Sequence, residues 1–216
     1  MNEFIKVKDW HKEKVLENIK EKLIKREFNA TILNTVEEIR DYIISAIPEK
    51  ATVGIGGSVT VRETGVDRRL KERGNIVFDH WSAELNNEQK LEARKKAQSA
   101  DYYLTGVNAL TSEGQIINID GAGNRVSSMI FGPSHVIAVA GYNKITKNTE
   151  DALRRIKNTA TPKNSKRLGL DTPCVAKGFC VDCRPPKSIC RVTTIIDYKP
   201  ALTDFTVILT SLELGF

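Results

Sequence analysis

This sequence of 216 residues is poor in long apolar runs and in aromatic side chains. No segment approaches the roughly 18 consecutive apolar residues that cross a bilayer, so we expect no membrane span. The first residues, MNEFIKVKDWHKEK, lack the apolar core of a secretory signal, which favours a cytoplasmic protein. Aromatic residues make up only 6%, and the basic residues alternate with Glu. The net charge of +6 therefore favours a small anionic ligand over nucleic acid.

Cysteine is equally scarce, but its four copies lie together in CVAKGFCVDCRPPKSIC, at Cys174, Cys180, Cys183 and Cys190. Four thiolates in one loop can bind one soft metal centre. A [4Fe–4S] cluster with four cysteine ligands is one interpretation. Structural zinc is the alternative, although zinc sites usually show two short Cys-x2–4-Cys pairs and this segment has one. Disulfides would need an oxidising compartment.

Short apolar runs alternate with helical patterns along most of the chain. The clearest predicted strands are Thr52–Ile55, Asn75–Phe78, Asp101–Thr105, Gln115–Ile119, His135–Ala140, Val192–Ile196 and Phe205–Leu209. Predicted helices cover 9–28, the residues after Thr35, and the segment from Asn86 or Asn87 to Ala100. This alternation predicts an α/β fold with a mostly parallel sheet covered by helices. We expect a single domain over 1–216, with a cysteine-rich segment at 171–192 after a linker at 159–169.

A glycine-rich turn follows the predicted strand at Thr52–Ile55. It contains Gly56, Gly57 and Ser58, with Gly54 in the strand before it and Thr60 at the start of the next helix. Glycine lets the backbone approach a ligand closely, and the first N–H groups of a helix can bind an anion. The turn is neither a Walker A loop nor a dinucleotide fingerprint, because it lacks their spacing. It predicts a site for phosphate or carboxylate, although glycine also serves packing alone at such turns.

Three stretches together resemble a known family. They are VGIGGSVTVRETG, DYYLTGVNALTSEGQIINIDGAGNRVSSMIFGPSHVIAVAGYNKI, and the cysteine segment ending in CRVTTII. This combination resembles the LUD-domain proteins, named for lactate utilization and formerly a domain of unknown function. The resemblance implies the fold shared by ribose-5-phosphate isomerases and CoA transferases. The second stretch is similar to a sugar-phosphate isomerase segment through Gly106, Gly114, Asn118 and Gly121.

The same comparison suggests candidate catalytic residues. Where those isomerases carry a catalytic Asp, this chain has Asn108, which cannot act as a base. CoA transferases of the superfamily use a Glu nucleophile, and Glu113 is the corresponding candidate here. Asp120 is a second candidate acid or base, with Arg125 near it in sequence. We expect Glu113, Asn118, Asp120, Gly121 and Asn124 to line the same cleft as the glycine turn, because ligand groups gather at one edge of such sheets.

The resemblance implies a single-cluster iron–sulfur component or accessory, acting in the oxidation of lactate or another small organic acid. Its partners would be a small anionic organic acid or sugar phosphate and iron–sulfur redox proteins. The alternative is a non-redox enzyme similar to the isomerases and CoA transferases, or a metabolite-binding regulator, in which the cysteines hold zinc.

Overall fold

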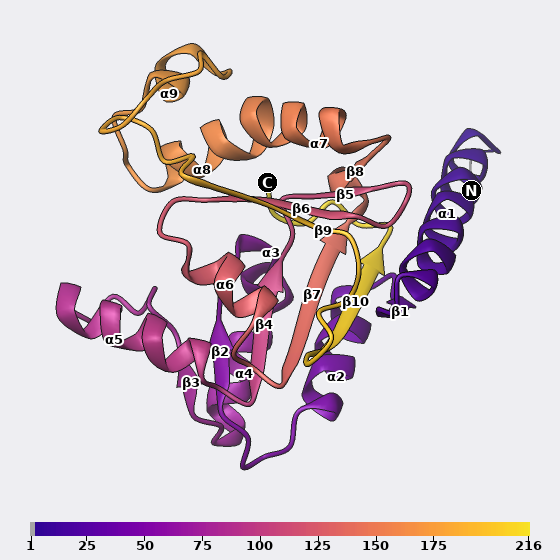
Figure 1. The fold of residues 1–216 in the computed structure, drawn as a ribbon. Coiled ribbons are helices and arrows are strands. Elements are labelled where there is room, and N and C mark those ends of the chain that lie inside the picture. Colours follow the sequence, from indigo (N-terminus) through magenta and orange to yellow (C-terminus); the bar gives the residue numbers. More distant parts are fainter. Residues whose placement is uncertain (1–2) are drawn as a thin grey trace.

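A sheet of six parallel strands forms the centre of the computed structural model, which describes residues 3–216 (Figure 1). Across the sheet the strands are β1 (Asn29–Ile32), β10 (Asp204–Thr210), β7 (His135–Gly141), β4 (Tyr102–Gly106), β2 (Val53–Ile55) and β3 (Val77–Phe78). Each neighbouring pair runs parallel. The predicted α/β class with a mostly parallel, helix-covered sheet is confirmed.

Helices cover both faces of this sheet, as parallel sheets require. They are α1 (Glu3–Lys25), α2 (Val36–Ala46), α3 (Val59–Thr64), α4 (Val66–Arg73), α5 (Asn87–Gln98) and α6 (Asn124–Ile130). Strand β7 shows how the faces divide, because its side chains alternate between two clusters. Val136 and Ala138 pack with residues of α1, α5 and α6, whereas Ile137 and Val139 pack with α2, α3 and α4.

A second, smaller sheet lies beyond the ends of the large one (Figure 1). Its strands are β8 (Ile145–Thr146), β5 (Ala109–Thr111), β6 (Ile116–Asp120) and β9 (Val192–Ile196). Strand β6 pairs antiparallel with both β5 and β9. The predicted strands Gln115–Ile119 and Val192–Ile196 therefore exist, but they belong to this second sheet and not to the parallel one.

The outer face of the small sheet is covered by a nearly continuous helical stretch. Its parts are α7 (Thr149–Arg155), the π-helical turn η2 (Ile156–Ala160) and α8 (Thr161–Arg167). The prediction of a linker at 159–169 was wrong. Helix α8 buries Pro162 and Ser165, which are small or polar, so no apolar stripe marked it as a helix. The short 3-10 turn η1 (Tyr142–Lys144) follows β7, and α9 (Pro173–Lys177) opens the cysteine segment.

Local capping signals were reliable guides to where helices begin. Thr35 accepts the N–H of Glu38, whose carboxylate accepts the N–H of Thr35, and the pair forms the predicted capping box. Asn86 and Gln89 form an equivalent box at the start of α5. Helix α1 differs from its predicted range because it starts at Glu3 and stops at Lys25, just before Glu27 adopts a left-handed φ of 68°.

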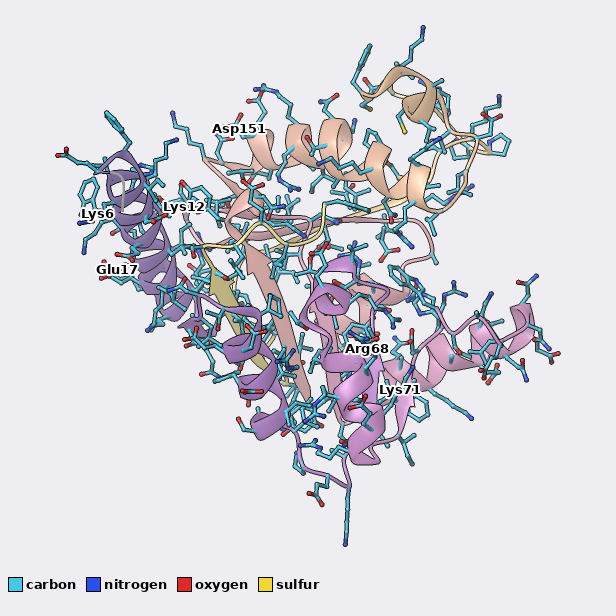
Figure 2. All side chains as sticks on the ribbon, turned by 180° about the vertical axis from the view of Figure 1, so that it is seen from behind. Lys6, Lys12, Glu17, Arg68, Lys71 and Asp151 are labelled. Atoms are coloured by element: carbon cyan, nitrogen blue, oxygen red, sulfur yellow. The ribbon has the colours of Figure 1, made fainter. Side chains whose placement is uncertain are left out.

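Charged side chains occupy the solvent side of the helices. Figure 2 shows Lys6 and Glu17 on α1 and Arg68 and Lys71 on α4 pointing away from the sheet. The basic residues are thus distributed over separate helices together with acidic ones. Among residues 3–216, none of the helices combines the length and the apolar character that a bilayer crossing demands.

Candidate functional site

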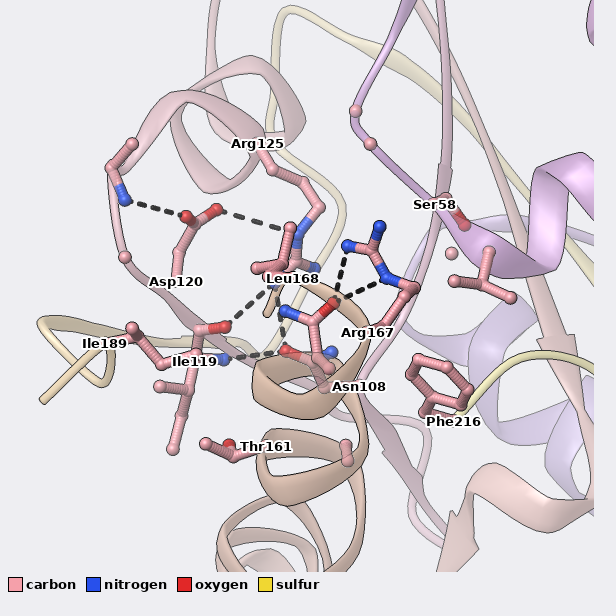
Figure 3. A pocket seen from close by; sticks show the side chains of 18 of the residues that line it. Ser58, Asn108, Ile119, Asp120, Arg125, Thr161, Arg167, Leu168, Ile189 and Phe216 are labelled. Carbon is pink, nitrogen blue, oxygen red and sulfur yellow. Dashed lines mark hydrogen bonds and ion pairs between the residues drawn. The ribbon is translucent and has the colours of Figure 1, made fainter. Parts of the chain in front are cut away.

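A cavity of about 280 Å³ opens where the carboxyl ends of β2 and β4 meet the small sheet. The glycine turn forms one wall, β6 and the start of α6 form a second, and α8 with the cysteine segment forms a third (Figure 3). Its charged lining residues are Arg94, Asp120, Arg125, Lys144 and Arg167, and its other titratable lining residues are His80 and Cys190. With four cationic side chains and one carboxylate, the described lining has the charge expected for binding an anion.

The glycine turn lies where the sequence placed it. Gly57 has φ 69°, a conformation that glycine adopts without strain. A Cβ atom on Gly57 would lie 2.8 Å from Nε1 of Trp81 and 3.1 Å from the His80 ring, so the turn packs tightly against the end of β3. Ser58 caps α3 by accepting the N–H of Val61 at 3.2 Å.

Gly54 and Thr60, which flank the turn, differ in whether they reach the cavity. Thr60 lines the cavity together with Gly56, Gly57 and Ser58, as predicted. Gly54 is not among the described lining residues, and a Cβ atom there would lie 2.5 Å from the carbonyl oxygen of Ala97 on α5. Gly54 thus lies behind the described lining, where its lack of a side chain serves the close packing of α5 against β2.

Arg125 on α6 is held by acceptors from β6 and from the loop after β4. Its Nη1 donates to Oδ1 of Asn118 at 2.7 Å, and its Nη2 donates to Oδ1 of Asn108 and to the carbonyl oxygen of Ile119, both at 2.9 Å. Asn118 is fully buried and also accepts the N–H of Asn108 at 3.0 Å. Asn118 was expected in the cleft, but it lies behind Arg125 and positions that guanidinium.

Asp120 faces Arg125 across the cavity wall (Figure 3). Its Oδ1 accepts the N–H groups of Ala122 and Gly123, both at 3.2 Å. Its Oδ2 lies 3.6 Å from Nε of Arg125 and is buried without a hydrogen-bond partner in the described structure. A buried carboxylate oxygen without a donor is unfavourable, and the nearby charge of Arg125 offsets part of this cost.

Gly121 and Asn124 line the cavity beside Asp120, as predicted. A Cβ atom on Gly121 would lie 3.1 Å from the carbonyl oxygen of Ile189, so the cysteine segment passes close to this glycine. Asn124 begins α6, although Gly123 and not Asn124 occupies the capping position.

Glu113 lies outside the cavity. Its side chain sits on the turn between β5 and β6, is 58% exposed, and accepts from Nζ of Lys22 on α1 at 2.9 Å. The expectation that Glu113 shares the cleft with the glycine turn is therefore wrong. Because β5 and β6 form an antiparallel hairpin, their connecting turn points toward α1 and away from Asp120 at the other end of β6.

Sequence reasoning overlooked three side chains of the cavity. Lys144 is 3% exposed and donates to Oγ1 of Thr60 at 3.0 Å and to the carbonyl oxygen of Val107 at 3.1 Å. The guanidinium of Arg167 lies 4.0 Å from the ring centre of Trp81, an arrangement that directs α8 toward the glycine turn. Arg94 on α5 is the third. The pattern G-Y-N-K-I after a buried strand was the one available signal for Lys144.

His80 is a neutral group of the cavity. Burial, followed by the charge of Arg94, lowers its pKa to about 4. Its ring is buried against the glycine turn.

The cysteine segment joins the cavity through Ile189 and Cys190. Sγ of Cys190 lies 3.8 Å from Oγ1 of Thr161, whereas Cys174 is buried beside Thr172 with an Sγ–Oγ1 distance of 3.2 Å. Burial raises the pKa of the Cys190 thiol, and the charges of the other three thiols act in the same direction. None of the four, all of which the structure describes, forms a disulfide.

The four thiols are soft ligands within one segment, and soft ligands are the kind that a soft metal centre requires. Across residues 3–216, however, no three Cys, His, Asp or Glu side chains converge as ligands of one ion. Binding one cluster would thus require the loop to turn its sulfur atoms toward a common point. Gly178 at φ 79° and Asp182 at φ 47° mark the bends of this loop.

Comparison with known proteins gives one sequence match and several structural ones. The sequence model of the LUD domain matches residues 16–210. A crystal structure of a DUF162 family protein from Deinococcus radiodurans is similar with a TM-score of 0.54 and 14% identity, covering 92% of this chain and 97% of that one. A crystal structure of eIF2B delta from Chaetomium thermophilum gives a TM-score of 0.36 and 15% identity, over 62% of this chain and 54% of that one. No curated protein sequence matches.

Proposed function

The chain belongs to the LUD-domain family, and on this premise we propose that it is a single-cluster iron–sulfur component in the oxidation of lactate or another small organic acid. The acid would bind in the cationic cavity, and Cys174, Cys180, Cys183 and Cys190 would hold a [4Fe–4S] cluster. The observation that carries this proposal is that Cys190 lines the cavity. A cluster on this cysteine would lie beside the bound acid.

The cavity suits a small anion. Its volume of about 280 Å³ is at or below the lower end of the roughly 300–1,000 Å³ of pockets for drug-sized ligands. The described lining contains the basic side chains of Arg94, Arg167 and Lys144 and a single carboxylate. Arg125 contributes charge, but its guanidinium is already bound to Asn108, Asn118 and Ile119.

A hydroxyl group on the acid would satisfy Asp120. Its Oδ2 is buried, lies in the cavity wall and lacks a donor among the described residues. A 2-hydroxy acid carries a carboxylate for the cationic wall and a hydroxyl that can donate to Oδ2. Its oxidation to a 2-oxo acid removes two electrons and two protons. Asp120 would receive the hydroxyl proton, the proton from C2 would pass to solvent, and the two electrons would leave singly through the cluster.

The cluster, when bound, would pass the electrons onward one at a time. A second redox protein with iron–sulfur centres would accept them, because one cluster cannot store both. The segment is basic around its thiols, with Lys177, Arg184, Lys187 and Arg191 inside or beside it. Their charges would offset the negative charge of four thiolates.

A second candidate is a non-redox enzyme or a metabolite-binding regulator in which the cysteines hold structural zinc. It is favoured by Asp120, since a carboxylate oxygen without a hydrogen-bond donor among the described residues also suits proton transfer without electron transfer. Metal analysis of protein produced anaerobically with ample iron separates the two. The redox proposal expects about four iron and four sulfide per chain. One zinc per chain with no iron would support the second candidate.

A further inference from the structure

The amine of Lys144 is buried and has no acidic hydrogen-bond partner in the described structure. Its side chain is 3% exposed, and its Nζ donates to Oγ1 of Thr60 and to the carbonyl oxygen of Val107. Both acceptors are neutral. A charged ammonium has a third N–H bond, and Lys144 is one of the residues that line the cavity, so an anion bound there is the candidate acceptor.

The charges that act on Lys144 come from three helices. Arg155 on α7 and Arg125 on α6 repel a proton on Nζ, and Glu63 on α3 is the one acidic group that attracts it among the described residues. Glu63 already accepts the N–H of Gly215 at 2.6 Å. Burial and the two arginines lower the pKa of Lys144 to about 7, so near neutral pH a large share of this amine is uncharged.

We propose that Lys144 is the counter-ion of the bound anion, and that the cavity takes up one proton from solvent when a carboxylate or other small oxyanion binds. The inference rests on the proposed function, because it assigns the partner of the anion in the same cavity. The anion supplies the negative charge that the surroundings of Nζ lack. Binding and protonation then favour each other, because the charged amine pairs with the anion.

The experiment is titration calorimetry with two probes, L-lactate and sulfate, at a pH about one unit above neutrality. Each titration is repeated in buffers of different ionisation enthalpy, because the slope of observed enthalpy against buffer enthalpy counts protons. For the unaltered protein we expect an uptake approaching one proton per bound anion. We also expect affinity to fall about tenfold per pH unit above the pKa of Lys144.

Lys144→Arg keeps a permanent charge, so it should bind without proton uptake. Lys144→Met should bind at least tenfold more weakly and also without uptake. Lys147→Met changes an exposed lysine three residues away and should leave the uptake unchanged. Circular dichroism and thermal melting confirm that each variant is folded.

Three results would be adverse, and they differ in what they overturn. Binding of either probe by the unaltered protein without proton uptake overturns the role of Lys144 alone. So does an unchanged uptake in both Lys144 variants, which would assign the proton to another group such as His80. Absence of binding by both probes overturns the proposed anion cavity itself.

Discussion

Sγ of Cys190 lies 3.8 Å from Oγ1 of Thr161, and both residues line the cavity that Asp120 and Arg125 border on another side. The cysteine segment and the anion site are therefore adjacent, although the sequence separates Asp120 from Cys190 by 70 residues. The contact between Gly121 and the carbonyl of Ile189 brings the same two segments together. The proposed redox function requires this adjacency.

If the four cysteines hold one cluster, each is needed for it. We expect Cys→Ser at Cys174, Cys180, Cys183 or Cys190 to lower bound iron and visible absorption after anaerobic reconstitution. Val181→Ala serves as the control, because Val181 is an exposed residue of the same loop without a thiol. Iron content that is unaffected by all four changes would show that the cysteines are not the ligands.

Replacing Asp120 by Asn should weaken selection for a hydroxyl group. Asn can still accept the N–H groups of Ala122 and Gly123, but its side chain cannot act as a charged acceptor at the second position. A hydrogen bond to a charged group contributes roughly 1.5–3 kcal/mol, so the preference for L-lactate over propionate should fall about ten- to a hundredfold.

Glu113→Gln provides the matched control for Asp120, because it removes a carboxylate on the exposed turn beside α1. It should leave the affinity for both acids unchanged. A loss of lactate binding in Glu113→Gln equal to that in Asp120→Asn would contradict the placement of the site.

Gly57→Ala should reduce both stability and anion affinity. The alanine would have to adopt φ 69°, and its Cβ atom would lie 2.8 Å from Nε1 of Trp81. The left-handed conformation costs about 1–2 kcal/mol in a residue with a Cβ atom. Gly74→Ala is the control, since Gly74 has φ 98° with nothing within 4 Å of its Cβ position.

Urea unfolding of the two variants measures the cost of backbone strain, and anion titration measures the loss of contact between the turn and the ligand. Both should lose stability, and only Gly57→Ala should lose affinity. Equal affinity in both variants would mean that the turn does not form the wall of the binding site.

His80 should make stability fall in mild acid. Its pKa is about 4 in the folded protein, below the usual 6.5, because burial disfavours the charged ring. The unfolded chain therefore binds more protons between these values, and the free energy of unfolding decreases as pH falls from about 6.5 to 4. The shift corresponds to about 3 kcal/mol.

Urea unfolding measured at pH 6.5 and at pH 4 isolates the contribution of His80 to the pH dependence of stability. His80→Gln should lose less stability on acidification than the unaltered protein. His11→Gln, at an exposed position on α1, should behave like the unaltered protein. If His80→Gln shows the same acid dependence as the unaltered protein, His80 is already charged in the folded state.

The sequence supported the large sheet and its helix starts because those signals are local. Capping pairs such as Thr35 with Glu38 need only neighbouring residues, and β7 is a continuous apolar run. The small sheet was harder, because β5 and β8 contain three and two residues and their pairing depends on distant segments.

The site was predicted in part for the same reason. The glycine turn, Asp120, Gly121 and Asn124 follow strand ends and could be read from the chain. Lys144 could not, because an isolated lysine is usually exposed and its burial arises only when η1 packs beside the turn. Arg167 is exposed at the end of α8, and only the packing of that helix brings it into the cavity lining.

The most direct test of the central claim is whether a bound acid perturbs the cluster. Protein reconstituted anaerobically and then reduced should give an electron paramagnetic resonance spectrum that changes when L-lactate saturates the cavity, because Cys190 lies in its wall. Asp120→Asn should require about ten- to a hundredfold more lactate for the same change. A colourless protein with one zinc per chain, or a cluster spectrum that saturating lactate leaves unchanged, would contradict the account.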